Sequence, residues 1–584
     1  MKKKYTRIIA ILIAMMMVIA MVAACAPEYE TAADPPPPPP PPADDSTDAP
    51  AADTEAPPAE VGFPDPDNIL RFGTTGIDGI FNPILASNVY DNYVVALVFE
   101  PLITNDAAGT FLPFLADWTL SEDNLTYTFT LREGITFSDG TPMTAEDVAF
   151  TFSTIGHPDY VGPRGYAVID LLGYDAYREG EADTFEGIRV IDARTVEFEY
   201  AEGTASPANI QNFVFPIMPK HIYDVGSWDE FTALNNTPVG SGWFTLEEYR
   251  DKEFIMLHRN LNYWNEPEAA LLDGILMSEI PEESLQGAFM TGQLDLAQPQ
   301  TSIDNWEAYT AMAGVNAQSI LANGYTYLQF NTLTPQLSDY RVRQALMYSL
   351  DRQAFIDALF GNLGSVGLAP ISPVSWAFPA SGLNDYAFNM ARAEELMEEA
   401  GWVMGADGVR TRNGVRMELT WLVYDDVAWP GVLSGLAADS WRTLGVDLNI
   451  DIMDFVTVQA LTSGVPINER DFSIYTMGWS TAIDPDITGG IFGMEDDTMD
   501  EGGFNQSGWF DQDVFDMMNE AAREFDQSRR AELYKELALV LNEQLPTAVV
   551  SYRYFIWVTS DRVNNLEIDS FIDWVYHINR VTLS

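Results

Sequence analysis

Residues 125–148 read LTYTFTLREGITFSDGTPMTAEDV and carry the signals of a strand, a tight turn and a helix, in that order. The segment Tyr127–Leu131 is rich in aromatic and β-branched side chains, which favour strands. Asp139-Gly140 is typical of a tight turn. Thr144 is a good helix cap, and Asp147 three residues later gives a pattern similar to a capping box. This stretch therefore predicts a strand followed by a helix that begins after Thr144.

Strand and helix signals stay interleaved along the rest of the chain. A second helix is predicted from Ser338 to a stop at Gly361. A third is predicted from about Asp513 to Gln544, in one or two pieces that end before Pro546. Further strand-like stretches are Thr195–Tyr200, Phe254–His258, Tyr325–Phe330, Leu419–Val423 and Ala548–Tyr552. This interleaving indicates an α/β or α+β body.

The N-terminal segment indicates export. A basic start is followed by an unbroken apolar run from Ile8 to Ala24 and then by Cys25, which is the single cysteine of the chain. This pattern predicts a signal peptide over residues 1–24. The position of Cys25 is similar to that in the lipobox of bacterial lipoproteins, so we expect cleavage before Cys25 and its lipidation. A plain signal peptide or an uncleaved anchor are the alternatives. Function is expected outside the cytoplasm, on the outer face of the cell membrane (in the periplasm of a Gram-negative cell).

Residues 25–62 are expected to form a disordered spacer. They contain eight consecutive prolines, Pro35 to Pro42. Polyproline is stiff and extended, at about 3.1 Å per residue. Such a segment lifts a globular body away from the lipid, and docking of the prolines to a partner is the alternative.

Composition limits the classes of partner. The 584 residues carry 87 Asp and Glu against 30 Lys and Arg, a formal net charge of −57. Such a surface repels nucleic acid and anionic lipid headgroups. The acidity serves either solubility or attraction of cationic ligands. The length predicts two or three lobes, and one cysteine allows neither an internal disulfide nor a cysteine-based zinc site.

Catalytic and cofactor motifs are missing from the sequence. No two of the four histidines form a metal motif, and there is no GxSxG elbow, phosphate loop or GxGxxG fingerprint. Nothing in these motifs suggests an ATPase, and no cofactor or metal site is expected. A secreted hydrolase that uses a carboxylate pair stays open as an alternative, because spatial pairing is invisible in a sequence. The acidic stretch 495–501 lacks the EF-hand spacing, which favours a solvated loop over a calcium site.

Aromatic residues are more informative. Several tryptophans lie in loop-like contexts, and each is either a core residue or part of a cleft lined by flat rings. They are Trp243, Trp264, Trp376, Trp429, Trp479 and Trp509.

A set of short motifs runs in order from about residue 68 to the C-terminus. In chain order these are Glu100-Pro101-Leu102, LPFLADW at 112–118, the stretch at 125–148, PVGSG at 238–242, Arg259-Asn260, Tyr263-Trp264, GQLD at 292–295, DYRVRQAL at 339–346, Leu350-Asp351-Arg352, AGW at 400–402, Gly478-Trp479, Asp484-Pro485 and the helix near Arg529-Arg530. The set resembles the extracellular solute-binding proteins of the dipeptide, oligopeptide and nickel ABC importers, solute-binding family 5.

The resemblance implies an α/β fold: a two-lobed periplasmic-binding-protein clamp of type II with three domains. Domain I is expected over 63–98, 238–322 and 556–584, an inserted domain II over 99–237, and domain III, the second lobe, over 323–555. Ligand is expected between lobes that close around it, and the closed form, a monomer, docks on a permease without making or breaking a bond.

The resemblance also suggests the ligand contacts. In peptide-binding relatives the Trp of the Gly-Trp pair lies in the cleft, and an Asp three residues later holds the peptide α-amino group. Here Trp479 is followed at that distance by Ala482, and the nearest acid is Asp484. Only Trp479 matches the family motif directly. The other expected ligand-binding residues are inferred from their neighbourhood in the sequence: Ser480, Thr481, Asp484, Asn88, Tyr90, Tyr325, Tyr327 and Trp376.

Peptides are the expected cargo, delivered to the permease subunits of an ABC importer. Oligosaccharides and nickel or other metal chelates are alternatives, because the aromatic content and Ala482 both favour them. A sensory or chaperone-like surface protein that passes ligand to a receptor is a further alternative.

Overall fold

The computed structural model describes residues 66–466, 469–488, 490–494 and 503–584. The predicted signal peptide, Cys25, the spacer and the acidic stretch 495–501 lie outside these residues.

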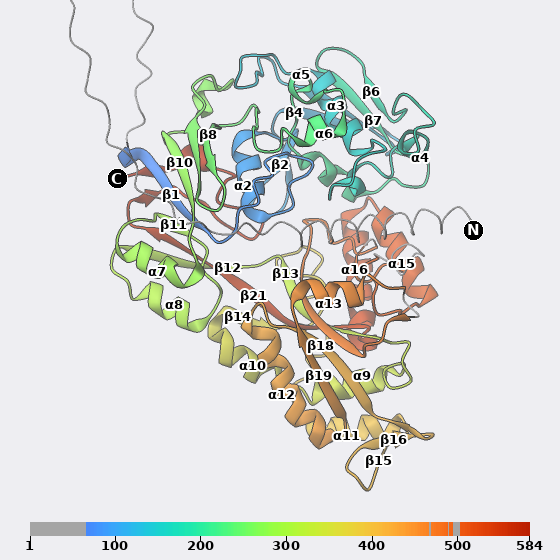
Figure 1. Ribbon diagram of the computed structural model, residues 1–584. Helices are drawn as coiled ribbons and strands as arrows, with labels where there is room; N and C mark the ends of the chain where they lie inside the picture. Colours follow the sequence, from blue (N-terminus) through green and yellow to red (C-terminus); the bar gives the residue numbers. More distant parts are fainter. Residues whose placement is uncertain (1–65, 467–468, 489, 495–502) are drawn as a thin grey trace, which may run out of the picture. The chain divides into compact units, whose positions relative to one another are not determined.

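Twelve strands of the described residues form one mixed sheet (Figure 1). In spatial order, its main path is β19 (Asp447–Met453), β18 (Glu418–Tyr424), β20 (Ile474–Ser480), β13 (Gly324–Phe330), β21 (Thr547–Ser560), β11 (Leu296–Ala297), β1 (Ile69–Thr74), β10 (Gly274–Glu279), β9 (Phe254–Arg259) and β8 (Phe244–Arg250). Two more strands, β12 (Val315–Leu321) and β14 (Gly364–Val366), pair with β21.

The 14-residue strand β21 holds the two halves of this sheet together. Its first half pairs with β13, where Leu328 lies opposite Ala548. Its second half pairs with β12, where Ala317 lies opposite Val558. Successive side chains of a strand point to opposite faces. Accordingly, Trp557 and Val558 enter two different hydrophobic cores.

These cores divide the described chain. Core 1 buries residues between Leu285 and Val558, and core 2 buries residues between Leu70 and Leu296 together with Trp557 and part of the C-terminal segment. The three-domain boundaries stay a prediction.

Smaller sheets flank the main one. They are β4 (Ala116–Leu120), β5 (Thr126–Leu131), β7 (Thr195–Glu199) and β6 (Ile188–Val190) in one sheet; β2 (Ile103–Asn105) with β3 (Phe111–Pro113); β15 (Val403–Met404), β16 (Arg410–Arg412) and β17 (Val415–Arg416); and β22 (Val563–Asn564) with β23 (Thr582–Leu583).

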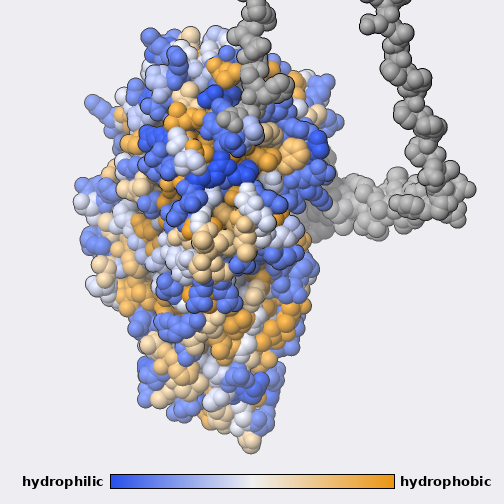
Figure 2. Space-filling model, turned by 90° about the vertical axis from the view of Figure 1, so that its left-hand side faces the viewer, coloured by the Kyte–Doolittle hydropathy of each residue, from blue (hydrophilic) through white to orange (hydrophobic). Residues whose placement is uncertain are grey.

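The helices lie between these strands in sequence. They are α2 (Val89–Val98), α3 (Ala145–Ile155), α4 (Tyr174–Arg178), α5 (Lys220–Tyr223), α6 (Trp228–Thr232), α7 (Glu282–Met290), α8 (Ile303–Thr310), α9 (Tyr340–Tyr348), α10 (Arg352–Leu359), α11 (Met390–Glu399), α12 (Ala428–Leu444), α13 (Phe455–Thr462), α15 (Gln512–Arg523) and α16 (Gln527–Gln544). Within the described residues, none is both long and apolar enough to cross a bilayer. On the face drawn in Figure 2, hydrophilic and hydrophobic residues are interspersed.

Most of the predicted elements are confirmed. Each predicted strand lies within or overlaps an observed one, and α3 follows Thr144, whose backbone N–H donates to Asp147 at 2.8 Å. The third predicted helix forms in two pieces, α15 and α16. The prediction of one helix from Ser338 to Gly361 is wrong, because the chain breaks between α9 and α10. There Asp351 accepts a hydrogen bond from the N–H of Ala354 at 2.9 Å and starts a new helix.

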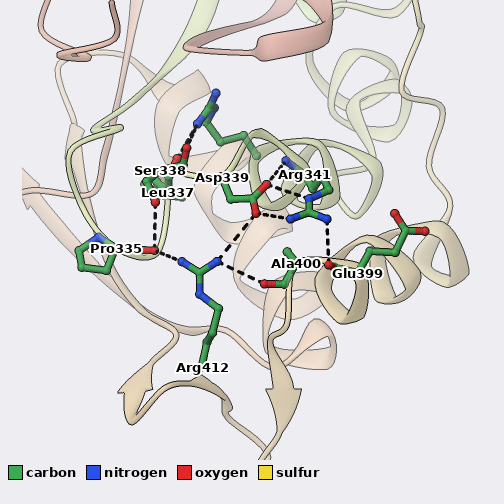
Figure 3. A network of polar contacts seen from close by, with 9 residues as sticks. Pro335, Leu337, Ser338, Asp339, Arg341, Glu399, Ala400 and Arg412 are labelled. Carbon is green, nitrogen blue, oxygen red and sulfur yellow. Dashed lines mark hydrogen bonds and ion pairs between the residues drawn. The ribbon is translucent and has the colours of Figure 1, made fainter.

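A polar network fixes the start of α9 (Figure 3). Asp339, not Ser338, caps this helix, since its Oδ1 accepts from the N–H of Arg341 at 3.0 Å. Burial raises the pKa of Asp339, but hydrogen bonds from Arg341 outweigh it and lower the pKa below the usual range. Arg343 is buried and donates to the carbonyls of Leu337 and Leu545 at 2.6 and 3.0 Å. The network therefore ties α9 to the end of α16.

A buried carboxyl joins core 2 to the segment after β9. Glu100 is 1% exposed and accepts hydrogen bonds from the hydroxyl of Tyr263 at 2.6 Å and from the indole of Trp264 at 2.8 Å. Burial disfavours the charged form and raises the pKa of Glu100 to about 7, although both hydrogen bonds oppose this shift.

Ionisation of Glu100 couples the fold to pH. Between the ordinary pKa of 4.5 and the raised value of about 7, the folded state keeps a proton that the unfolded state has released. The contribution of this group to stability is therefore complete below the lower value, falls through this window and stays low above it. Glu100→Gln should remove this dependence. As the pH rises from about 4.5 to about 8, the free energy of unfolding of the variant should increase by about 3 kcal/mol relative to that of the wild type. Urea unfolding at several pH values measures the difference, and a pH-independent difference would contradict the assignment.

Candidate functional site

The strands of the second half of the sheet share a carboxyl edge. Strands β18 and β19 are parallel and end side by side at Tyr424 and Met453, and β20, which is also parallel to β18, runs on past this level to Ser480. The antiparallel strand β13 begins at this edge with Gly324, which lies opposite Ser480. Ligands of open α/β sheets bind outside the carboxyl ends of the strands. This edge is therefore the candidate site.

Trp479 lies at the end of β20 and is half-buried. Its ring meets that of Phe504 edge-on, with centroids 5.5 Å apart. Tyr325, opposite Trp479 in β13, and Tyr327 are only 3% and 2% exposed. Burial raises the pKa of both tyrosines above the usual range. Trp479 and Tyr325 therefore lie opposite one another on the same face of the sheet, and the exposed Ser480 points to the other face.

The backbone after Trp479 is held by Asn323. The N–H of Thr481 donates to the carbonyl of Asn323 at 3.0 Å, and the Asn323 amide donates to the carbonyls of Thr481 and Ala482 at 2.9 and 3.0 Å. No motif in the sequence predicts this role for Asn323. These bonds fix the turn that contains Thr481 and Ala482.

Asp484 lies in a buried ion pair with Arg530. The two side chains are 9% and 4% exposed, and the guanidinium reaches both carboxylate oxygens at 2.5 and 2.8 Å. The guanidinium lies 5.8 Å from the ring centre of Trp376 and 5.3 Å from that of Tyr534. Burial lowers the pKa of Arg530, but Asp484 raises it by more. Asp484 and Trp376 therefore meet at Arg530, whose pairing the sequence does not reveal.

The two remaining predicted residues lie at the start of α2, in core 2. Asn88 caps this helix by accepting from the N–H of Tyr90 at 2.8 Å, and its amide donates to Asp78 at 3.2 Å. The hydroxyl of Tyr90 is 2.8 Å from that of Thr75, just after β1. The structure thus brings the nine predicted residues together in three groups, and their contact with ligand stays a prediction.

The chemistry of these groups is that of binding. They offer rings, amides, hydroxyls and exposed backbone at the carboxyl edge. Within the described ranges, no group of three or more His, Cys, Asp or Glu side chains is placed to hold a metal ion.

The pair of Asp484 and Arg530 gives a stability test. Asp484→Asn should lower the free energy of unfolding by about 3–5 kcal/mol, because it leaves a buried guanidinium without its counter-charge. Glu520→Gln is the matched control, since it removes the partner of the neighbouring, exposed Arg529 and should cost at most about 1 kcal/mol. Denaturant unfolding measures both variants. Equal losses of unfolding free energy in the two variants would show that the ion pair of Asp484 with Arg530 does not stabilise the fold.

Comparisons with known proteins agree on one family. The oligopeptide-binding protein AppA of Bacillus subtilis (strain 168) is 23% identical over 500 residues, covering 84% of this chain and 87% of the relative. The nickel-binding periplasmic protein of Escherichia coli (strain K12) is 25% identical over 495 residues, covering 81% and 87%. The solved structure of AppA from Bacillus subtilis in complex with a nonapeptide has a TM-score of 0.71 at 21% identity, covering 88% of this chain and 98% of that one.

The structural similarity confirms the predicted α/β fold of periplasmic binding proteins. A profile described as bacterial extracellular solute-binding proteins, family 5 Middle, matches residues 111–492, more than half of the chain. The chain therefore belongs to the bacterial extracellular solute-binding proteins of family 5.

Proposed function

We propose that this protein is a lipid-anchored extracytoplasmic receptor that captures peptides and delivers them to the permease of an ABC importer. Cys25 carries the anchor, the proline-rich segment is the spacer, and no bond is made or broken in the cargo. Membership of family 5 supports the role of a binding protein. The peptide cargo needs a further argument from the site.

The open side of β20 carries that argument. On one side β20 pairs with β13 along its whole length, from Ile474 to Ser480. On the other side, its register with β18 covers only Ile474 and Tyr475 among the described residues. The following backbone up to Ser480 has no strand partner there in the part of the chain that the structure describes. Such an edge can pair with the main chain of an extended peptide, independently of its side chains.

The predicted residues have distinct roles in this proposal. Trp479, Ser480 and Thr481 contact the peptide along the open side of β20. Tyr325, Tyr327 and Trp376 supply apolar walls. Asp484 holds the guanidinium of Arg530 in place beside the ring of Trp376. Asn88 and Tyr90 close the site from the start of α2. Because Asp484 is already paired, the α-amino group of the peptide needs another acceptor, such as the backbone carbonyls at the edge.

Nickel or another metal chelate is the second candidate cargo. A relative named for nickel binding covers 81% of this chain, and Ala482 stands where peptide binders have Asp. An oligosaccharide fits the aromatic walls equally well.

Native mass spectrometry of the protein, truncated before Val61 and purified without denaturant, tests the cargo. A heterogeneous set of adducts with peptide masses is the expected result. A single adduct of hexose or metal-chelate mass would overturn the peptide assignment. A protein without adducts is then screened by thermal shift, where ligand at 100 times its Kd should add about 2.7 kcal/mol of stability.

The indole of Trp479 should carry part of the affinity. We expect Trp479→Ala to weaken cargo binding by about 1–3 kcal/mol and to leave the protein folded. Trp306→Ala is the control, because it removes another half-buried indole, on α8. Calorimetric titration and thermal unfolding measure the two effects. Unchanged affinity together with lost stability would make Trp479 a packing residue.

A further inference from the structure

Arg553, in the middle of β21, is half-buried and has no hydrogen bond or ion pair from its side chain to any described residue. Every other arginine of the described ranges that is not exposed donates to a carboxylate, a carbonyl or an amide oxygen. With 87 acidic residues for 30 basic ones, acidic partners are plentiful in this chain. An arginine left without one is therefore a specific feature.

The guanidinium of Arg553 lies at the carboxyl edge. Its carbon is 6.0 Å from the ring centre of Trp429. One of its nitrogens lies 3.5 Å from the position that a Cβ atom would take on Gly478, the residue before Trp479. Tyr424 ends β18 and meets the ring of Trp429 edge-on, with centroids 5.8 Å apart. Aromatic rings and a bare glycine thus surround the charge.

Among the residues that the structure describes, none forms an ion pair with this guanidinium. Burial lowers the pKa of Arg553, and the opposing influence comes from Tyr424, which is itself neutral near pH 7 because burial raises its pKa to about 12. The nearby Asp426 accepts a hydrogen bond from the N–H of Phe455 at 2.7 Å. A half-buried cation without a counter-charge destabilises the protein in which it stands.

A helix start adds positive potential at the same edge. Trp429 lies in the first turn of the 17-residue helix α12, and the preceding Val427 has no side chain that can cap it. The first N–H groups of a helix favour negative charge. Two independent features therefore attract an anion to the space beside Trp429 and Gly478.

We propose that Arg553 binds a carboxylate group of the cargo. The inference rests on the proposed function, because it names the chemistry that the same site selects. A guanidinium presents a planar fork that matches a carboxylate in two parallel hydrogen bonds. The carboxylate comes either from the C-terminus of a peptide or from the chelator of a metal complex. Gly478 leaves this side of the guanidinium without a side chain, since a Cβ atom there would lie 3.5 Å from one of its nitrogens.

Binding studies on the full-length chain in detergent test this. The probes are pentapeptides of neutral residues with a free C-terminal carboxylate, the same peptides as C-terminal amides, and the nickel(II) complex of L-histidine. The variants are Arg553→Gln and Arg553→Lys. Arg442→Gln is the control, because Arg442 is an exposed arginine on α12 and its loss changes the net charge equally. Calorimetric titration gives the affinities, and thermal unfolding without ligand gives the stabilities.

Arg553→Gln should weaken binding of a carboxylate probe by about 10- to 100-fold, with Arg553→Lys between it and the wild type. Amidation of the peptides should weaken their binding to the wild type by a similar factor. The amidated peptides should then bind Arg553→Gln and the wild type with equal affinity. Arg442→Gln should bind as the wild type does. The ligand-free Arg553→Gln protein should be at least as stable as the wild type, because it loses an uncompensated charge.

The outcomes separate this inference from the proposed function. Peptide binding that neither Arg553→Gln nor amidation changes would overturn the role of Arg553 and leave the peptide receptor intact. Binding of the nickel complex alone, lost in Arg553→Gln, would support Arg553 and overturn the peptide cargo. A ligand-free Arg553→Gln protein that is less stable than the wild type would show a structural role and overturn the inference. Failure of every carboxylate probe to bind the wild type would overturn both.

Discussion

The continuous hydrogen bonding of β21 is the constraint on which the rest of the structure depends. One extended segment pairs with β13 and β14 in its first half and with β11 and β12 in its second half. The two cores are therefore not independent bodies on a flexible linker, because neighbouring residues of one strand, Trp557 and Val558, enter different cores. Any relative movement of the two cores must bend or twist this strand. Arg553 lies in the middle of this strand. A cargo bound to Arg553 would therefore contact the strand that any such movement deforms.

The buried and half-buried arginines Arg343, Arg352, Arg530 and Arg553 differ in what partner their guanidinium has. Arg530 has a carboxylate partner in Asp484. Arg343 and Arg352 have backbone carbonyls, which stabilise the ends of elements without adding charge. Arg553 has neither. The first two arrangements hold the fold together, while an unsatisfied donor at the carboxyl edge is the arrangement expected of a group that awaits a ligand.

The family resemblance and the site carry different kinds of information. At about 25% identity or less, the relatives share the pattern of strands, caps and turns, which depends on hydrophobic alternation and short polar signals. In the proposed function, cargo choice depends on a few positions around the edge, such as Ala482 and the paired Asp484. The open side of β20 would accept any extended backbone, so specificity would come from the side chains around it.

The sequence by itself determined the α/β class, the positions of the six predicted strands, the cap at Thr144, a C-terminal helical segment of one or two pieces, and the family resemblance. These follow from local periodicity, capping chemistry and ordered motifs, all of which act between neighbours in the chain. It did not determine the break at Asp351 within a nearly continuous helical pattern, since a local cap there overrode the periodicity. Only the tertiary structure decided that Asp484 meets Arg530, that Asn323 holds the turn at Ala482, and that Arg553 has no ion-pair or hydrogen-bond partner among the described residues. The physical reason is that such pairings join residues far apart in sequence, and in a chain with 87 carboxylates no spacing tells which one a given arginine will reach.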